Sequence, residues 1–347
     1  MGALSMSDHP GISGTPAAAA NHGSLADKVA WLRGQLGAGD EAIETHFAWV
    51  FLAGDRAWKL RKPVRRDPMD YGTLDARRRG SEAEVQLNRR LAPGVYLGIR
   101  PLTRTADGRF AIGGDGIVVD WLVEMRRLDR HRMLDEMLTS GRATGHELDL
   151  VVGMLADFYR HEVPAVTDGA ALAARLRAQA DANHNVIATL DVAGAARLRE
   201  AQLAFISAHG DWLDARASGG CIVEAHGDLR PEHILLDEPP AVIDCLEFDR
   251  NLRILDRAEE LEFFAMECSR LGHAATGDRI ARDCLARLTD GAPPQLRHFY
   301  RSHRAATRAK LYVWRATEPD GGVPQQWLET ARAYLKLALA SIGTANR

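Results

Sequence analysis

The sequence predicts an α+β protein with two lobes, a smaller one built from a β-sheet and a helix and a larger one that is mainly helical. Three observations carry this prediction. The composition is that of a globular chain, with 46% hydrophobic and 26% charged residues among 347. Short apolar runs alternate with polar residues between positions 48 and 128. From about residue 130 onward, apolar residues recur with helical spacing instead.

The first 23 residues are rich in Gly, Ala, Ser and Pro and carry no periodic pattern, which predicts a disordered tail over 1–23. We expect the N-terminal lobe over 24–125 and the C-terminal lobe over 126–347, with a connector near 124–129. The elements expected in the smaller lobe are a helix capped by Ser24 and running to Leu36, hairpin strands at 48–53 and 56–60, a helix at 73–91, and strands at 95–102 and 116–128.

The larger lobe is expected to be helical, with one strand-rich island. The expected helices are 132–139, 147–162, 169–189, 193–215, 255–271, 274–289, 292–317 and 323–342. The island consists of short apolar runs at 221–225, 234–236 and 241–244, separated by polar turns.

Charge and pattern argue against several classes of protein. Lys and Arg number 44 against 47 Asp and Glu, for a net charge of −3, so we expect no dedicated nucleic-acid binding. No apolar run approaches the ~20 residues that span a bilayer. The N-terminus lacks the pattern of a secretory signal, and the four cysteines form no CxxC pair. We therefore expect a cytoplasmic protein without a membrane partner; the oligomeric state is not predicted.

The island carries the residues most suited to chemistry. Asp228 lies on a polar loop just after an expected strand, and Asp244 lies at the end of another short strand. Two carboxylates sixteen positions apart across a hairpin can converge on one point. One would orient a nucleophile, and the other would hold a divalent cation through oxygen.

The segment His226-Gly-Asp-Leu-Arg-Pro-Glu-His-Ile234 resembles the H-G-D-x-x-P-x-N-[IVL] catalytic loop of aminoglycoside phosphotransferase-like kinases. Ile243-Asp-Cys245 resembles their I-D metal-binding segment. Residues 48–63 and 84–93 are similar to a largely uncharacterised bacterial branch of that superfamily, some members of which are fused to a P-loop ATPase. The resemblance covers residues 40–315 and implies a bilobal protein-kinase-like fold.

The resemblance also implies a function, which is transfer of the γ-phosphate of ATP, with Mg²⁺, to a hydroxyl of a small molecule. Asp228 would orient the acceptor hydroxyl, and Asp244 would bind the metal. Lys59 would neutralise the α- and β-phosphates, and Glu84 would pair with Lys59. The backbone of Glu124 and Met125 would hydrogen-bond adenine.

The local pattern supports the smaller-lobe assignments independently. Ala57 and Lys59 point to one strand face, and the small Ala57 leaves room there for a flat base. On the following helix, Glu84 belongs to the inward stripe with Leu87, Asn88 and Leu91. A carboxylate on an inward face needs a partner, because burying it unpaired costs several kcal/mol.

The sequence departs from the family pattern at His233, which stands where the family has a metal-binding Asn. Mg²⁺ prefers oxygen to an imidazole nitrogen. Four alternatives follow: one metal suffices, Glu247 or Glu232 supplies the missing oxygen, Mn²⁺ is tolerated with His233 as a ligand, or catalysis is impaired. There is also no glycine-rich phosphate loop and no G-x-x-x-x-G-K-[ST] motif.

Plainer interpretations compete with these roles. Lys59 could be a solvated strand residue, and Glu84 could pair with Arg77 or Arg78 instead. His226 is interpreted as a hydrogen-bonding brace for the loop. The acidic residues between 256 and 262 either attract a cationic acceptor or balance the basic helix around 297–310.

Three functions therefore compete. The first is a small-molecule O-phosphotransferase. The second is a pseudokinase-like regulatory module that binds nucleotide without efficient turnover. The third is a zinc hydrolase with His226, Asp228 and His233 as metal ligands.

Overall fold

The computed structural model describes residues 23–36, 42–66, 69–317 and 323–346 of the chain. The predicted disordered tail therefore lies outside the described residues, apart from Gly23. The fold is α+β, as predicted, and the chain divides into two compact units. The first contains the chain up to Val85 together with Val95–Arg127, and the second contains Gln86–Gly94 and Leu128–Arg347.

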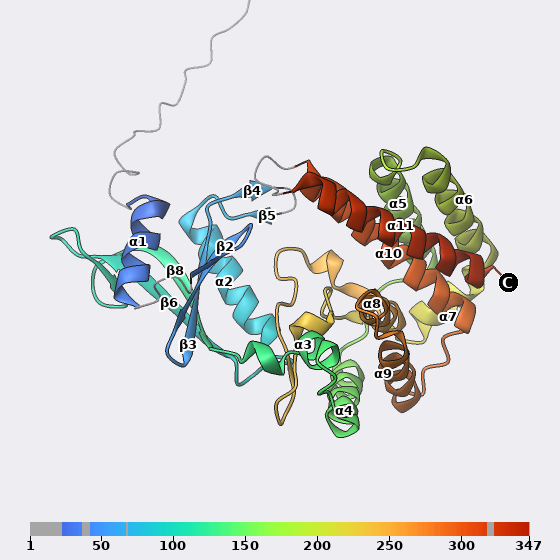
Figure 1. Cartoon of the computed structure of the whole chain (residues 1–347), viewed down its shortest axis with the longest axis horizontal. Helices are drawn as coiled ribbons and strands as arrows, with labels where there is room; N and C mark the ends of the chain where they lie inside the picture. The colour runs from blue at the N-terminus through green and yellow to red at the C-terminus, as the bar shows by residue number, and fades with distance from the viewer. Residues whose placement is uncertain (1–22, 37–41, 67–68, 318–322, 347) are drawn as a thin grey trace, which may run out of the picture. The chain divides into compact units, whose positions relative to one another are not determined.

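The first unit is built on a six-stranded antiparallel sheet with the strand order β1-β2-β3-β8-β6-β7. Figure 1 labels β2, β3, β6 and β8 of this sheet. Its strands are β1 (Ala42–Glu44), β2 (Ala48–Ala53), β3 (Arg56–Arg61), β6 (Tyr96–Arg104), β7 (Phe110–Ile112) and β8 (Ile117–Arg126). A separate pair consists of β4 (Arg65–Arg66) and β5 (Met69–Asp70). The sequence predicted β2, β3, β6 and β8; the other strands have two or three residues each, too few to produce a recognisable alternation.

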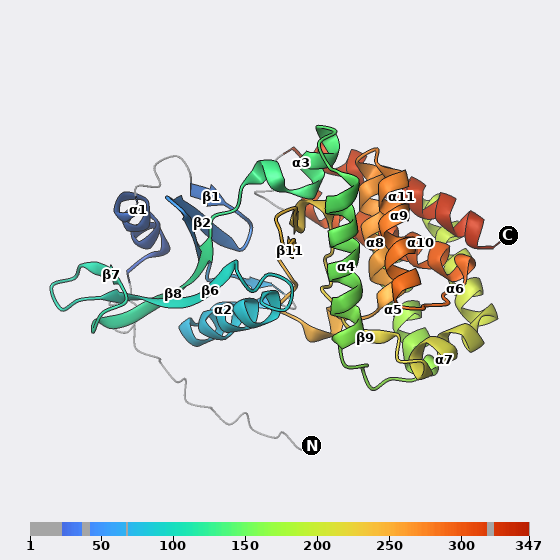
Figure 2. The same ribbon diagram turned by 90° about the horizontal axis from the view of Figure 1, so that it is seen from below.

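Two helices cover opposite faces of this sheet (Figure 2). Helix α1 (Leu25–Gln35) packs Val29 and Leu32 against a small apolar core that includes Leu60. Ser24 caps it through a capping box with Asp27. Helix α2 (Leu74–Asn88) lies against the other face, so the two faces of β3 meet different helices.

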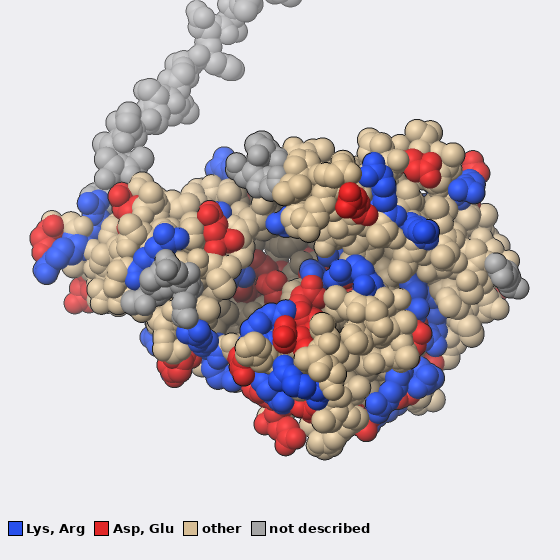
Figure 3. Space-filling model, viewed as in Figure 1, with Lys and Arg blue, Asp and Glu red and all other residues tan. Residues whose placement is uncertain are grey.

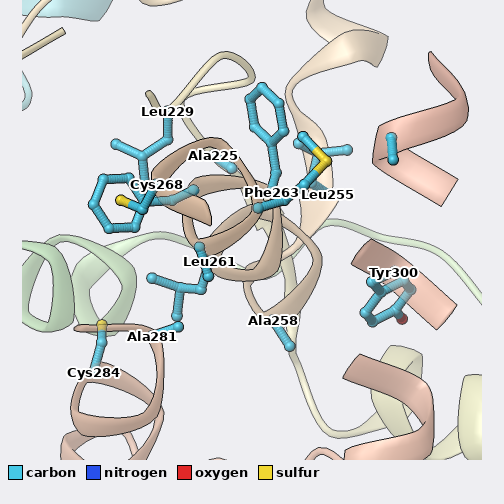
Figure 4. Packing of buried hydrophobic residues seen from close by; sticks show 14 of the residues in the cluster. Ala225, Leu229, Leu255, Ala258, Leu261, Phe263, Cys268, Ala281, Cys284 and Tyr300 are labelled. Atoms are coloured by element: carbon cyan, nitrogen blue, oxygen red, sulfur yellow. The ribbon is translucent and has the colours of Figure 1, made fainter. Parts of the chain in front are cut away.

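The second unit is mainly helical. Its helices are α3 (Leu134–Thr139), α4 (Gly145–His161), α5 (Gly169–Ile187), α6 (Val192–Ala208), α7 (Gly210–Ser218), α8 (Arg257–Arg270), α9 (Ala274–Arg287), α10 (Pro294–Ala316) and α11 (Pro324–Ala345), with short 3-10 turns η2 (Arg130–Arg132), η3 (Pro231–His233) and η4 (Arg250–Leu252). Helix α8 packs against both α9 and α10 and carries the centre of the core. Figure 4 shows Leu261, Phe263 and Cys268 of α8 among buried side chains from other elements.

The strand-rich island folds as two small antiparallel pairs. Strands β10 (Ile234–Leu235) and β11 (Ala241–Val242) form one pair, and β9 (Ile222–Glu224) and β12 (Ile254–Asp256) form the other. The helix predicted from residue 255 therefore begins only at Arg257, because Asp256 ends a strand and caps α8 with its side chain.

The predicted single helix over 193–215 is wrong. The chain breaks at His209, whose φ of −122° and ψ of 37° are not helical, so α6 ends and α7 starts there. The His209 ring stacks on Trp212 at a centroid distance of 4.0 Å and contacts Phe205 in a tilted arrangement at 4.4 Å. Helical periodicity continues across the break because both helices bury apolar residues in the same core.

No helix in the described part of the chain has the length and apolarity needed to cross a membrane. On the face shown in Figure 3, Lys and Arg side chains are interspersed with Asp and Glu.

Candidate active site

The first unit places a lysine and a glutamate together. Alternation along β3 directs Ala57, Lys59 and Arg61 toward α2. The Lys59 ammonium donates a hydrogen bond to Glu84 Oε1 at 2.8 Å. The Glu84 side chain is only 1% exposed, whereas that of Lys59 is 17% exposed. The pair expected from the helical stripe is thus present.

A second cation, which the sequence interpretation did not assign, shares this carboxylate. Arg61 donates from Nη2 to Glu84 Oε2 and to the carbonyl oxygen of Gly80. Its guanidinium lies 4.6 Å from the ring centre of Tyr71. A Cβ at Gly80 would come within 2.7 Å of the Tyr71 ring, so glycine makes room for this stack. Two cations thus share one carboxylate, and Lys59 is the more exposed of the two.

The alternative partners proposed for Glu84 are engaged elsewhere. Arg77 donates from Nε to Asp120 Oδ1 at 2.7 Å, and this Asp120 carboxylate also accepts from the buried Lys28 of α1. Arg78 contacts the exposed Glu82 one turn further along the helix.

Glu124 and Met125 lie inside β8 and not in a connector, because the strand continues to Arg126. Met125 is directly opposite Ala57 in the ladder between β3 and β8. The Glu124 carboxylate accepts a hydrogen bond from Arg100 at 2.8 Å. Strand β8 ends at Arg126, and the first unit continues to Arg127.

In the second unit, the two aspartates of the predicted site meet around one imidazole. His233, in the 3-10 turn η3, has Nδ1 at 2.9 Å from the carbonyl oxygen of Asp228. The same nitrogen lies 3.9 Å from Asp228 Oδ2, and Nε2 lies 3.7 Å from Asp244 Oδ2. The β10–β11 hairpin brings them together, since the Ile243 N–H donates to the carbonyl of His233 at 2.9 Å.

His226 braces the loop, as the sequence interpretation suggested. Its Nε2 lies 3.0 Å from the carbonyl of Ile243, which can only accept, so Nε2 carries the hydrogen. Nδ1 then accepts from the Asp228 N–H at 3.4 Å. Burial of the ring lowers the pKa of His226 to about 4. One neutral imidazole thereby joins the Asp228 loop to the residue before Asp244.

Glu260 of α8 clamps the start of the same loop. Its carboxylate accepts from the backbone N–H groups of His226, at 3.0 Å, and of Gly227, and from the Tyr159 hydroxyl at 2.7 Å. Gly227 has a φ of +90°, which disfavours any side chain. Burial raises the pKa of Glu260, and the hydrogen bonds it accepts oppose that rise.

Asp244 has a backbone φ of +64°, in the left-handed region that Asp tolerates better than most residues. The next residue fixes this conformation, because the Cys245 N–H donates to Asn88 Oδ1 at 3.0 Å. Strained backbone held by its surroundings is common where a side chain must be aimed at a ligand. The Asp244 side chain is 54% exposed.

Positive charge surrounds Asp228. Burial would raise the pKa of its carboxyl, but the charges of Arg230, His233 and Arg308 outweigh that effect and lower the pKa to about 2. Arg230 Nη1 lies 3.3 Å from Asp228 Oδ2. Asp228 is therefore ionised at any physiological pH.

The acidic residues near the start of α8 are buried and paired, which decides between their two interpretations. Glu262 accepts from Arg297 at 2.6 Å and from Arg301 at 2.9 Å. Glu259, 1% exposed, lies near Arg304 of the same basic helix. These carboxylates balance α10 and are not displayed to a cationic acceptor.

The side chains near Asp228 and Asp244 determine which ligands a metal ion would find at this site. Within the described ranges, no three or more His, Cys, Asp or Glu side chains form a group that could hold a metal ion. His226 uses both ring nitrogens within the protein, which removes a ligand from the zinc-hydrolase hypothesis. His233 and Asp244 present a nitrogen and an oxygen 3.7 Å apart, which fits a divalent cation that takes its other ligands from a substrate or water.

Several functional contacts were missed at the level of sequence. Arg61 follows Ala57 and Lys59 at the same period of two, so extending the alternation by one step would have found it. Glu260 and Asn88 were recognised only as an acid and as part of a helix stripe; nothing local indicates that they hold backbone N–H groups of the loop.

A sheet unit with a strand lysine paired to a helix glutamate, followed by a helical unit with a His-Gly-Asp loop, defines the protein-kinase-like class of fold. Among solved structures, the chain is similar to a GDP complex of a point mutant of aminoglycoside 2′-phosphotransferase-IIIa, with a TM-score of 0.55 and 15% identity over 93% of this chain and 100% of that one. The chain thus has the fold of aminoglycoside phosphotransferase-like kinases. A glucosamine kinase bound to glucosamine, ADP and phosphate has a TM-score of 0.45 at 17% identity, over 85% of this chain and 74% of that one.

By sequence, the chain is 34% identical over 296 residues to uncharacterised proteins of Mycobacterium tuberculosis and Mycobacterium bovis. The alignment covers 83% of this chain, and the chain spans 57% of the length of each relative. No model of a protein family matches the chain.

The shared carboxylate makes a stability prediction. Arg61→Met removes the more buried of the two cations that pair with Glu84, and we expect the free energy of unfolding to fall by about 3 kcal/mol, as for one partner lost from a buried pair. Lys59→Met keeps the Arg61–Glu84 pair, so it should cost about 1 kcal/mol. Urea unfolding of both variants measures the difference; equal losses would contradict the shared arrangement.

The buried neutral histidines predict a pH dependence. Burial lowers the pKa of His226 to about 4 and that of His303 to about 3, below the 6.5 of an exposed histidine. Below pH 6.5 these two histidines bind protons in the unfolded chain but stay neutral in the folded chain. The free energy of unfolding therefore falls on acidification. Each histidine contributes up to about 1.4 kcal/mol per pH unit. The free energy of unfolding, measured at pH 7, 6 and 5, should fall less steeply with pH for His303→Phe than for the natural chain. Identical slopes would refute the contribution of His303 to the pH dependence.

Proposed function

We propose that this chain is a nucleotide-dependent phosphotransferase that moves a γ-phosphate to a hydroxyl of a small molecule. The observation that carries the proposal is the meeting of Asp228 and Asp244 around His233, on a loop that His226 and Glu260 hold from both sides. In phosphoryl transfer, a protein contributes chiefly by positioning the reactants and by neutralising the charge of the phosphates.

Asp228 takes the role of orienting the acceptor. With a pKa of about 2 it is a weak base, so it accepts a hydrogen bond from the acceptor hydroxyl and aims the oxygen at the γ-phosphorus. The new oxygen–phosphorus bond forms as the bond from the γ-phosphorus to the β,γ-bridging oxygen breaks. The hydroxyl proton passes to Asp228 late in the step and then to water.

We assign the neutralisation of the nucleotide's phosphate charge to Lys59 and to a cation bound by Asp244. Asp244, with His233 beside it, would hold a divalent cation, which supplies electrostatic stabilisation of the phosphates when bound. Lys59 is the more exposed of the two cations that pair with Glu84, which suits it to the α- and β-phosphates. We assign the nucleobase to the strand pair of Ala57 and Met125 and the backbone near Glu124.

The acceptor is proposed as a neutral or anionic hydroxyl compound. Glu259 and Glu262 form ion pairs with arginines of α10. The charges of Arg230 and Arg308 act on Asp228 and lower its pKa. A polycationic acceptor would find no displayed carboxylate among those of α8.

A regulatory module that binds nucleotide without turnover is the second candidate. The observation that favours it is His233, whose ring reaches both aspartates at a position where the kinase pattern has an amide. The two candidates differ in turnover and not in binding.

Turnover and binding by two variants test the proposal. The natural chain should release ADP or GDP from a nucleoside triphosphate in the presence of a hydroxyl acceptor. Asp228→Ala should lower that rate by about 10²-fold or more while nucleotide affinity changes less than threefold, because its role is in the reacting step. Asp244→Ala should weaken metal-dependent nucleotide binding itself, measured by calorimetry.

Both ATP and GTP belong in the assay, because the similar phosphotransferase was solved with GDP. Binding by the natural chain without turnover over a panel of sugars, amino alcohols and hydroxy acids would favour the regulatory module. No nucleotide binding at all would refute both candidates.

A further inference from the structure

We propose that His233 is itself a ligand of the divalent cation, through Nε2, and that the site therefore selects first-row transition ions over Mg²⁺. The inference rests on the proposed function for the remaining ligands, which are phosphate oxygens and water. It concerns the identity of the metal, which the fold alone does not determine.

The hydrogen bond at the other ring nitrogen fixes the tautomer. Nδ1 of His233 lies 2.9 Å from the carbonyl oxygen of Asp228. A carbonyl oxygen only accepts, so Nδ1 carries the hydrogen, and in the neutral ring Nε2 carries the lone pair. Metal-binding histidines commonly donate their second N–H to a carbonyl or carboxylate, which orients the ring and increases its basicity.

Nε2 is directed at a second ligand. It lies 3.7 Å from Asp244 Oδ2, and ligands about 2.1 Å from one ion can be up to about 4 Å apart. The two residues also sit on a braced backbone. The Ile243 N–H donates to the His233 carbonyl, and Ile234 pairs with Val242. A single ion can therefore contact both side chains without a change of the hairpin.

The donor pair determines the preference. Mg²⁺ demands oxygen ligands and gives up water reluctantly. An imidazole nitrogen is a better ligand for first-row transition ions, with affinity rising from Mn²⁺ to Co²⁺. Arg230 holds one carboxylate oxygen of Glu232, Oε1, so this oxygen does not replace the imidazole nitrogen.

Pulsed electron paramagnetic resonance of bound Mn²⁺ tests the ligand directly. The full chain is produced with ¹⁵N-labelled histidine and mixed with Mn²⁺ and a non-hydrolysable ATP analogue of natural isotope content. We expect a ¹⁵N hyperfine coupling from a directly bound imidazole. The isotope separates this signal from the nitrogens of the nucleotide base.

His233→Asn is the matched control, because it replaces the ring nitrogen with an amide oxygen of similar reach. It should lose the ¹⁵N coupling while still binding Mn²⁺ and nucleotide. The ratio of the Mg²⁺ to the Mn²⁺ dissociation constant, measured by calorimetry, should fall at least tenfold relative to the natural chain.

Bound Mn²⁺ without ¹⁵N coupling in the natural chain would overturn the inference, as would failure to bind Mn²⁺ or an unchanged ratio of dissociation constants in His233→Asn. The first result needs no variant, so it holds even if His233→Asn folds poorly. Turnover with no ¹⁵N coupling would remove this inference and leave the proposed function. A ¹⁵N coupling without turnover for any acceptor would support the ligand and contradict the phosphotransferase proposal.

Discussion

The position of one imidazole between two carboxylates organises the second unit's site. His233 donates to the backbone of Asp228 and directs its other nitrogen at Asp244, so the ring sets the distance between the two aspartates. The surrounding contacts serve to keep that geometry. Glu260 and His226 fix the loop before Asp228, and Asn88 fixes the residue after Asp244. A site of this kind is preorganised, because its hydrogen bonds are made before any substrate arrives.

Buried ion pairs hold charged side chains in place inside each unit. In the first unit, Glu84 pairs with both Lys59 and Arg61, and the Lys59 side chain is the more exposed of the two cations. In the second, the acids of α8 neutralise the arginines of α10, and Asp228 stays ionised among positive neighbours. The fold is shared with an aminoglycoside phosphotransferase, but a shared fold does not determine the substrate.

Periodicity predicted the α+β class and the order of the longer elements, and it placed Glu84 on the side of α2 that faces β3. The hairpin of β2 and β3, the inward Glu84 and the convergence of Asp228 with Asp244 follow from spacing that local sequence records. The break at His209 did not, because the same apolar stripe continues on both sides of it. The left-handed Asp244 and the clamp by Glu260 depend on residues distant in the chain, so no local pattern could reveal them. That Lys59 serves the same nucleotide as the two aspartates stays a prediction.

The tautomer of His233 is the most direct test of the account. Long-range ¹H–¹⁵N spectra of the ¹⁵N-histidine chain, free of metal and assigned by comparison with a variant that lacks this ring, report which nitrogen carries the hydrogen. The account predicts a neutral ring protonated at Nδ1, with an unprotonated Nε2. A neutral ring protonated at Nε2 would contradict it, because the hydrogen bond to Asp228 and the lone pair toward Asp244 would both be lost.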